Sequence, residues 1–490
     1  MIRTVLHNSR ALTSGRRFLS TLLSKNPDKI TLEDLKASNQ DDIAGRMSLI
    51  KSINLSANSN KQQLINELIP DFSIYFKLDP AIKNTNEVLS RIIQVNPGRV
   101  HSSWELFQLH SSNLDEISVS LIKNLLNKLI TGEAVDQSEN YIIDFDNLHR
   151  LQTLLTDHIV SDISQYESDL IQLLDKLIQD DSVAFIGFLI NDILSPPFIV
   201  EYMKTFHDRN TPSENCVFLL MVEKVLEEDP TLLTTEQYIK ALDIINLKSE
   251  QLEPIMSKQV ELSKHLSIEF KPSIVRDLDK KILKYIQESD IDLEAGNILL
   301  RQKIIESYGI FSNDTESALK KFHQYQTHAS YGIEFVGATL AKVFGYQAIN
   351  QNKEIYAEVA ATLAPPDSMT VRLLQSLIIS QSFFKPDSGL SIYNNYINQV
   401  GSDLIQNTGR SSKGLLTEAV VLGFLQNNDR SFASLIFEKA IDNKIITYEP
   451  EISTIKKLFK AYSDCFVEDE DWSKAKIKMK EFVLKFMKNL

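Results

Sequence analysis

Apolar residues recur along most of the chain at intervals of three and four, in segments separated by short polar breaks. This spacing is typical of amphipathic helices, in which a turn of about 3.6 residues places such positions on one face. The sequence therefore predicts two series of helices. The first runs through 83–95, 100–110, 114–131, 144–162, 165–179, 182–193 and 197–207. The second runs through 276–287, 292–307, 315–325, 330–348, 352–362, 368–382, 387–399, 413–427, 430–443, 450–463 and 471–488.

The breaks between these segments indicate how the helices connect. Polar connections of 2–8 residues are typical of stacked antiparallel helix pairs. Prolines cannot continue a helix, and several of them are expected at the breaks: Pro196–Pro197, Pro212, Pro230, Pro254 and Pro272. A further break between the two series is expected near 264–276, in "KHLSIEFKPSIVR".

The helix pairs recur at a spacing near 35–40 residues. Leu416 and Ile452 open equivalent helices 36 residues apart, and Phe432 and Trp472 open the second helices 40 residues apart. Such a period is typical of helical arrays. We therefore expect an all-α protein, a right-handed solenoid of antiparallel helix pairs, with arrays over 67–270 and 271–490. Residues 26–66 contain polar stretches such as "LSANSNKQQ", and we expect that region to be poorly ordered.

The first 25 residues differ in character from the rest. They carry five basic side chains, and no Asp or Glu occurs before Asp28. A basic, hydroxyl-rich amphipathic segment is typical of a mitochondrial transit peptide. We expect residues 1–25 to direct import into the matrix, with peripheral association at the inner membrane left open. The mature chain should begin near Asn26, because "FLSTLLSK" after Arg17 resembles the octapeptide that matrix processing removes.

Composition narrows the possible partners. The formal net charge is −13, and removal of the five basic residues would leave −18, which disfavours indiscriminate binding to nucleic acid. Any RNA contact should be local. Cys216 and Cys465 lie far apart and outside metal-ligand spacing, so we expect packed thiols in a reducing compartment. No apolar stretch reaches the roughly 18 residues that a transmembrane helix needs.

One helix pair carries a family resemblance. "LLTEAVVLGFLQNNDRSFASLIFEKAIDNKIITYEP" has Ala433, Ile436 and Phe437 at the core places of a second helix. The pattern resembles a degenerate pentatricopeptide repeat, and residues 97–126 and 368–397 look similar. The usual aspartate at the end of each unit is absent. With the matrix address, the chain resembles fungal mitochondrial factors that stabilise, process or activate translation of organellar mRNAs.

The resemblance implies where RNA would bind. In that family, a polar residue early in the first helix of each unit reads one base. At the matching places stand Gln375, Thr417 and Ser453, whose side chains can donate and accept hydrogen bonds. Lys456 and Lys457 would lie near phosphates. Each of these polar residues also fits an exposed first turn with no such function.

The C-terminal segment "DWSKAKIKMKEFVLKFMKNL" leaves two interpretations open. Its apolar positions fall on one helical face, with lysines around it. It could contact an anionic partner such as RNA or a cardiolipin-rich surface. It could equally cap the array, with its apolar face on the preceding helix pair and its lysines in water.

Motifs for catalysis are incomplete. "GATLAKVFG" (337–345) lacks the Gly-Lys-Ser/Thr ending of a phosphate-binding loop, and His323 and His328 match neither a metal-binding helix face nor an HExxH motif. We therefore expect no enzyme, no cofactor and no metal. Two classes of function remain. The first is an RNA-binding factor for mitochondrial mRNA, without DNA binding. The second is a matrix scaffold or assembly factor for proteins of the mitoribosome, the respiratory chain or the inner membrane.

Overall fold

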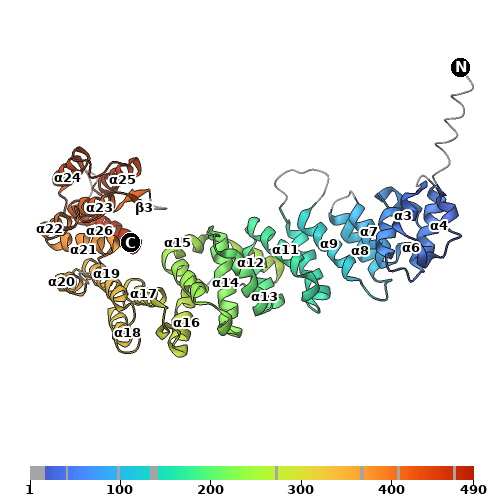
Figure 1. Ribbon diagram of the computed structural model, residues 1–490, viewed down its shortest axis with the longest axis horizontal. Helices are drawn as coiled ribbons and strands as arrows, with labels where there is room; N and C mark the ends of the chain where they lie inside the picture. Colours follow the sequence, from blue (N-terminus) through green and yellow to red (C-terminus); the bar gives the residue numbers. More distant parts are fainter. Residues whose placement is uncertain are drawn as a thin grey trace, which may run out of the picture. The chain divides into compact units, whose positions relative to one another are not determined.

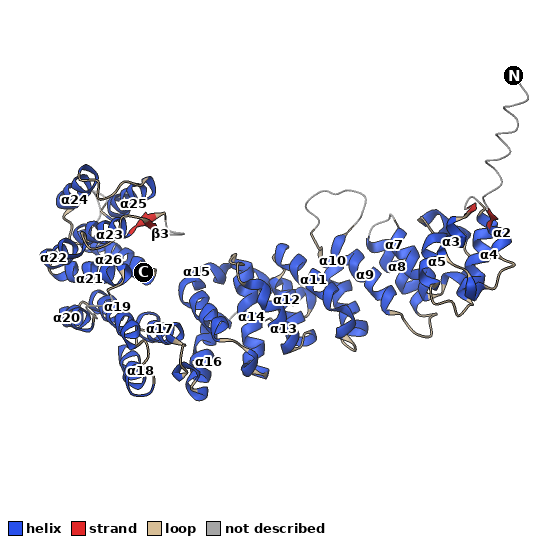
Figure 2. Ribbon diagram, viewed as in Figure 1, coloured by secondary structure: helices blue, strands red, loops and turns tan. Residues whose placement is uncertain are grey.

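A computed structural model describes residues 17–39, 42–96, 100–132, 142–270, 274–364, 369–405, 409–466 and 471–490 (Figure 1). Helices make up nearly all of the regular structure in these residues (Figure 2). The described strands form two short pairs: β1 (Arg17–Phe18) with β2 (Ser38–Asn39), parallel, and β3 (Leu404–Ile405) with β4 (Arg410–Ser411), antiparallel. The prediction of an all-α protein is confirmed.

The chain divides into two compact units. The first contains the described residues of Met1–Leu220 and Ile255–Lys271, and the second contains those of Met221–Pro254 and Pro272–Leu490. Helices α14 (Pro212–Glu228) and α15 (Thr235–Leu266) contribute to both. One of the boundaries between the two units lies at Lys271 and Pro272, next to the boundary predicted between the two helical arrays.

Short helices build the first unit. They are α2 (Leu19–Leu22), α3 (Leu32–Lys36), α4 (Ile43–Asn54), α5 (Lys61–Leu68), α6 (Pro80–Lys83), α7 (Asn86–Val95), α8 (Val100–Ser111), α9 (Val119–Thr131), α10 (Phe145–Leu154), α11 (Glu167–Gln179), α12 (Val183–Phe188) and α13 (Pro196–Met203). Turns of π-helix, Leu155–Ile159 and Leu189–Ile193, extend α10 and α12. Most segments of the first predicted series therefore correspond to observed helices.

The region expected to be poorly ordered is helical in the structure. Residues 26–66 include α3, α4 and most of α5, and Leu49, Ile50 and Leu64 are completely buried in a common core. Asn58 ties this region together, because its side-chain amide donates to the carbonyl oxygens of Pro27 and Ile30. The polar stretch that suggested disorder thus makes the turn between α4 and α5. Residues 1–16 of the predicted transit peptide lie outside the described residues.

Pro254 departs from the prediction that it marks a break. It lies inside α15, a continuous helix of 32 residues. A proline inside a helix removes one backbone hydrogen bond, so packing around α15 must outweigh that loss. The prolines that begin α13 and α14 do lie at breaks, as predicted.

The second unit repeats one packing arrangement. Its helices are α16 (Ile274–Ser289), α17 (Ile298–Glu306), α18 (Thr315–His328), α19 (Ile333–Gln351), α20 (Glu354–Leu363), α21 (Val371–Phe384), α22 (Pro386–Tyr396), α23 (Ser412–Leu425), α24 (Arg430–Asp442), α25 (Glu449–Cys465) and α26 (Trp472–Lys488). Helices α17, α19, α21, α23 and α25 contact one another in that order. Helices α18, α20, α22 and α24 each pack on one or both of their sequence neighbours in that row.

The last helix, α26, contacts two helices of this row that are far apart in sequence. Helix α26 packs on α25 and also returns to α19, where the Lys480 ammonium donates to the Asn350 carbonyl at 2.9 Å. Met479, Val483 and Met487 are buried in the core of this unit. The apolar face of α26 is therefore buried, as the capping interpretation expects, but it packs on α19 as well as on the preceding helix pair, and Lys480 contacts protein rather than water. A right-handed solenoid of repeats stays a prediction.

Small residues allow α21, α22 and α23 to approach closely. A Cβ atom added to Gly389 would lie 1.8 Å from the Ser382 hydroxyl and 2.7 Å from the Ile378 carbonyl. Gly389→Ala should therefore lower the free energy of unfolding by about 1–3 kcal/mol, because rigid backbone must move. Gly401→Ala is the matched control, since nothing lies within 4 Å of the added atom. Equal unfolding midpoints for the two variants in urea would contradict this packing.

Candidate functional site

The structure places two predicted base-reading residues in the protein interior. The Gln375 side chain is 2% exposed and donates to the Leu415 carbonyl at 3.1 Å. Thr417 is completely buried, donates to the Lys413 carbonyl and lies 3.2 Å from the Tyr393 hydroxyl. As these helices are packed, neither side chain can reach a base. Both positions serve helix packing instead.

The other three predicted residues lie on α25. Ser453 is partly exposed, and Lys456 and Lys457 are exposed. Their accessibility is compatible with contact to RNA, and their assignment stays a prediction. The structure does not bring them together with Gln375 and Thr417 on one open surface, because the latter two are enclosed.

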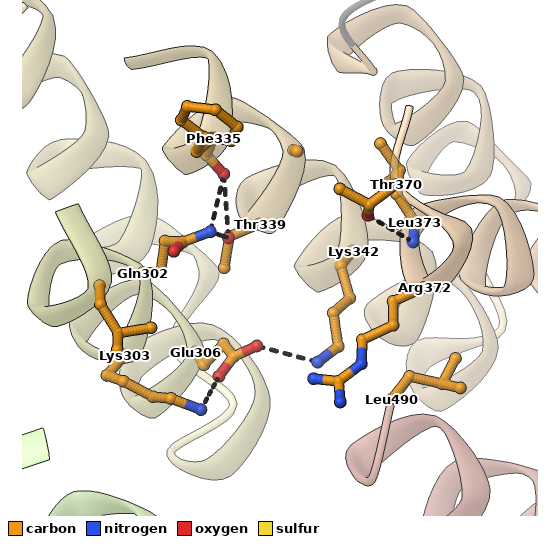
Figure 3. A pocket seen from close by; sticks show the side chains of 12 residues that line it. Gln302, Lys303, Glu306, Phe335, Thr339, Lys342, Thr370, Arg372, Leu373 and Leu490 are labelled. Atoms are coloured by element: carbon orange, nitrogen blue, oxygen red, sulfur yellow. Dashed lines mark hydrogen bonds and ion pairs between the residues drawn. The ribbon is translucent and has the colours of Figure 1, made fainter. Parts of the chain in front are cut away.

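A pocket elsewhere in the second unit gathers basic side chains (Figure 3). We call it the α17–α19–α21 pocket, after the helices that line it. Its volume is about 230 Å³. The described lining residues are Leu299, Gln302, Lys303, Glu306, Phe335, Ala338, Thr339, Lys342, Thr370, Arg372, Leu373 and Leu490. A smaller adjoining hollow shares Lys303, Lys342 and Arg372 and adds Lys488.

Glu306 is the centre of the charge network in this pocket. Its carboxylate lies 3.2 Å from the Lys303 ammonium and 2.8 Å from the Lys342 ammonium, while Lys303 also lies 2.8 Å from Asp243. Burial alone would raise the pKa of Glu306, but Lys342 and Lys303 outweigh burial and hold the pKa below its ordinary value. Burial alone would lower the pKa of Lys303, but the carboxylates of Glu306 and Asp243 outweigh burial and raise the pKa above its ordinary value. Glu306 and Lys303 are therefore charged at neutral pH.

Glu306→Gln should lower the free energy of unfolding by about 2 kcal/mol at neutral pH, because it leaves two half-buried ammonium groups without their shared partner. A carboxyl group with a lowered folded-state pKa stabilises the fold above its ordinary pKa and loses that contribution as pH falls. The difference between wild type and variant should thus shrink below about pH 4.5. Urea unfolding across pH measures it. A constant difference would refute the ion-pair network. Glu288→Gln, in an exposed pair, is the control.

Arg372 contributes a positive charge that this network does not use. Its side chain is exposed, and its guanidinium makes no hydrogen bond or ion pair with the described residues. Figure 3 shows it pointing toward the Lys342 ammonium. Lys488, in the adjoining hollow, lies over the Phe311 ring at 5.9 Å from the ring centre. The pocket therefore combines surplus positive charge with an open entrance.

The C-terminal residues of the chain are similar to known proteins. Residues 394–490 match the family described as the MRX12 C-terminal domain. The chain is also similar to MIOREX complex component 12 of Saccharomyces cerevisiae. The two are 23% identical over 407 residues, which cover 79% of this chain and 76% of the yeast protein.

These matches change the interpretation of the helix pair at 415–450. The matched family is the MRX12 C-terminal domain, so the pentatricopeptide resemblance is not supported. Ala433 is buried, and Ile436 and Phe437 are partly buried against the same core. Packing of any antiparallel helix pair demands apolar residues at such places, which explains why the pattern misled.

Within the described ranges, no group of three or more His, Cys, Asp or Glu side chains could hold a metal ion, and no helix is long and apolar enough to cross a membrane. Cys216 and Cys465 are buried and form no disulfide, as predicted, and burial raises the pKa of Cys216 to about 12.

The pocket residues escaped sequence reasoning for a simple reason. Lys303, Lys342 and Arg372 come from three helices and are separated by about thirty to forty residues. The local signal was limited to Lys303 and Glu306, a pair three positions apart on one helix face. Such pairs are common on solvated helices, so the pattern alone would not have marked a site.

Proposed function

We propose that this protein is a component of a mitochondrial gene-expression complex and acts by binding rather than by catalysis. The observation that carries the proposal is the similarity to MIOREX complex component 12, which extends over 407 residues and both units. The basic N-terminal segment, free of acidic residues before Asp28, supports import into the matrix.

RNA is the first candidate ligand. A helical-repeat surface carrying local positive charge would suit single-stranded mitochondrial mRNA, because the net charge of −13 excludes broad electrostatic attraction. The α17–α19–α21 pocket supports this choice, since cations and an exposed aromatic ring both line it. Aromatic and basic side chains together are typical of sites for unpaired nucleic acid.

A protein partner is the second candidate, and a separate observation favours it. The segment that matches the MRX12 C-terminal domain exposes several large apolar side chains: Leu404, Ile405, Leu435, Ile441, Trp472 and Ile477. Apolar groups on a surface are the usual anchors of protein interfaces. This segment would then hold the complex together while the preceding helices bind RNA.

Affinity purification from mitochondria tests the proposal. A tagged chain should co-purify with mitoribosomal and other gene-expression proteins, as identified by mass spectrometry. The purification is repeated after nuclease treatment. Loss of the partners with nuclease indicates that RNA bridges them, and retention indicates a scaffold. Recovery of neither gene-expression proteins nor mitochondrial RNA would refute the proposed function.

The location has its own test. Glutamates in place of Arg10, Arg16 and Arg17 should leave the protein in the cytosol, because the reversed charge opposes import along the membrane potential. Protease protection in isolated mitochondria measures this. Unchanged import would show that residues 1–25 are not the address.

A further inference from the structure

We propose that the α17–α19–α21 pocket binds one unpaired nucleotide of RNA, with the phosphate between Lys342 and Arg372 and the base against Phe335. This assignment rests on the proposed function, because it names the site at which RNA would be held. It differs from the sequence-based prediction, which placed RNA on α21, α23 and α25 at Gln375, Thr417 and Ser453.

The phosphate position follows from an imbalance of charge. Lys342 and Arg372 point toward one another (Figure 3), and Glu306 is the one acidic side chain among the described lining residues. Glu306 pairs with Lys303 and Lys342, and Lys303 also pairs with Asp243 of the adjoining hollow, so no acidic side chain of the pocket pairs with Arg372. The Arg372 guanidinium has five N–H donors in a planar fork, and the described residues accept from none of them. A phosphate would fill the space between two like charges and accept from both.

The start of α21 adds to this preference. Thr370 and Arg372 both line the pocket, and Thr370 caps the helix by accepting from the backbone N–H of Leu373 at 3.2 Å. Helix α21 has 14 residues, so its first turn carries the partial positive charge of a full helix dipole. The dipole and the two cations therefore favour an anion at the same place.

The other side of the pocket suits a base. Phe335 is 43% exposed and Leu299 is 52% exposed, so apolar surface is accessible beside the charged groups of the pocket. The Gln302 side-chain nitrogen donates to the Phe335 carbonyl and the Thr339 hydroxyl, which fixes the amide plane. Its amide oxygen has no partner within the described residues and can accept from a base edge. Stacking on Phe335 would cover the ring that the protein leaves exposed.

The dimensions exclude larger ligands. A volume of about 230 Å³ is below the range of pockets for drug-sized molecules, so only a small chemical group can enter it. A single phosphate with its sugar fits a hollow of this size, with the base at the rim against the exposed Phe335 ring. A phosphorylated peptide could also supply the anion, but it would offer no planar group to stack on Phe335. An RNA nucleotide would therefore contact more of the residues that line the pocket.

Three variants of the full chain test the assignment. Arg372→Ala removes the unused cation, and Phe335→Ala removes the stacking surface. Arg430→Ala is the matched control, an exposed arginine that also lies in the first turn of a helix but outside the pocket. Lys342 is left intact because its loss would break the ion pair with Glu306. Circular dichroism and unfolding midpoints should match wild type for all three.

The probe is a labelled random-sequence single-stranded RNA of about ten nucleotides, whose binding is followed by fluorescence anisotropy across salt concentrations. Arg372→Ala should weaken binding on the order of tenfold and reduce the slope of log affinity against log salt by about 0.7, the loss of one phosphate contact. Phe335→Ala should weaken binding on the order of tenfold with the slope unchanged. Arg430→Ala should behave as wild type. Inorganic phosphate should compete only weakly.

Each alternative outcome has a distinct meaning. If RNA binds and neither pocket variant weakens it, the nucleotide assignment fails while the proposed function stands. If Arg372→Ala weakens RNA but Phe335→Ala does not, or if inorganic phosphate competes as well as RNA, the pocket is an anion site without a base and the assignment fails. If wild type binds no RNA, the assignment fails, and purification from mitochondria decides separately whether the protein belongs to a gene-expression complex.

Discussion

Replacing Arg301 by methionine should lower the free energy of unfolding of the second unit by about 3–5 kcal/mol. Among the described residues that are less than 2% exposed, Arg301 has the largest side chain, at 1% exposed. Its guanidinium donates to five backbone carbonyl oxygens at 2.7–3.3 Å, those of Asp292, Leu293, Glu294, Ala329 and Tyr331. Two chain segments, before α17 and before α19, are therefore held by one side chain.

A second polar group completes this arrangement. The Asp292 carboxylate is completely buried, lies 2.9 Å from the Lys321 ammonium and accepts from the Tyr325 hydroxyl at 2.7 Å. Burial, followed by Asp292, raises the pKa of Tyr325, so the hydroxyl keeps its proton and donates. Loss of Arg301 would leave several buried carbonyl groups unsatisfied next to this network, which explains the large expected cost.

Urea unfolding followed by hydrogen exchange of the 291–297 and 329–332 amides measures the effect. Arg301→Lys should also be destabilising, because an ammonium has three donors and cannot span five carbonyls. Arg372→Met, the same change at an exposed arginine of the same unit, should alter stability by less than about 0.5 kcal/mol. Similar losses for the two methionine variants would contradict the view that Arg301 joins these segments.

Glu451→Gln should destabilise the segment that matches the MRX12 C-terminal domain by about 2–4 kcal/mol. Glu451 is 1% exposed, and each carboxylate oxygen accepts from two donors. One oxygen accepts from the backbone N–H and hydroxyl of Ser411 at 2.6 Å, and the other accepts from the N–H groups of Thr447 and Tyr448 at 3.3 Å. A glutamine would turn an NH₂ group toward two donors.

The neighbouring contacts leave no room for adjustment. A Cβ atom on Gly414 would lie 2.2 Å from the Glu451 carboxylate, so the start of α23 is pressed against it. Glu449→Gln is the control, because Glu449 is exposed in the first turn of the same helix. Thermal unfolding of both variants and protease cleavage near 409–414 provide the measurement. A Glu451→Gln protein as stable and as protease-resistant as the control would contradict this interpretation.

The spacing of apolar residues was sufficient to predict most helices, but it was not sufficient to predict which of their residues are exposed. Segments such as 430–443 and 471–488 match α24 and α26 within a residue, because a polar break or cap interrupts the apolar spacing at each end. The prediction that Pro254 marks a break between helices was wrong, because α15 continues through this residue. The polar stretch "LSANSNKQQ" was wrong as a sign of disorder, because Asn58 within it makes contacts with Pro27 and Ile30 that only the folded structure reveals.

The candidate site could not be predicted in the same way. Buried residues occupy α21 continuously from Leu373 to Ser380 and α23 continuously from Gly414 to Leu425. The repeat resemblance places Gln375 and Thr417 early in the first helix of a unit, where the base-reading residue would be exposed. Both are buried instead, because α21 and α23 are enclosed on more than one face. The pocket depends on which helices become neighbours, and that information lies in contacts between residues distant in sequence.

The return of α26 to α19 bears on how the molecule is made. A polypeptide leaves the ribosome from its N-terminus, so α19 is available about 130 residues before Lys480 can reach Asn350. Until then, the apolar places that Met479, Val483 and Met487 will cover remain open to other chains. The second unit thus completes its core late in biosynthesis, and a chaperone that protects α19 during this interval should increase its yield.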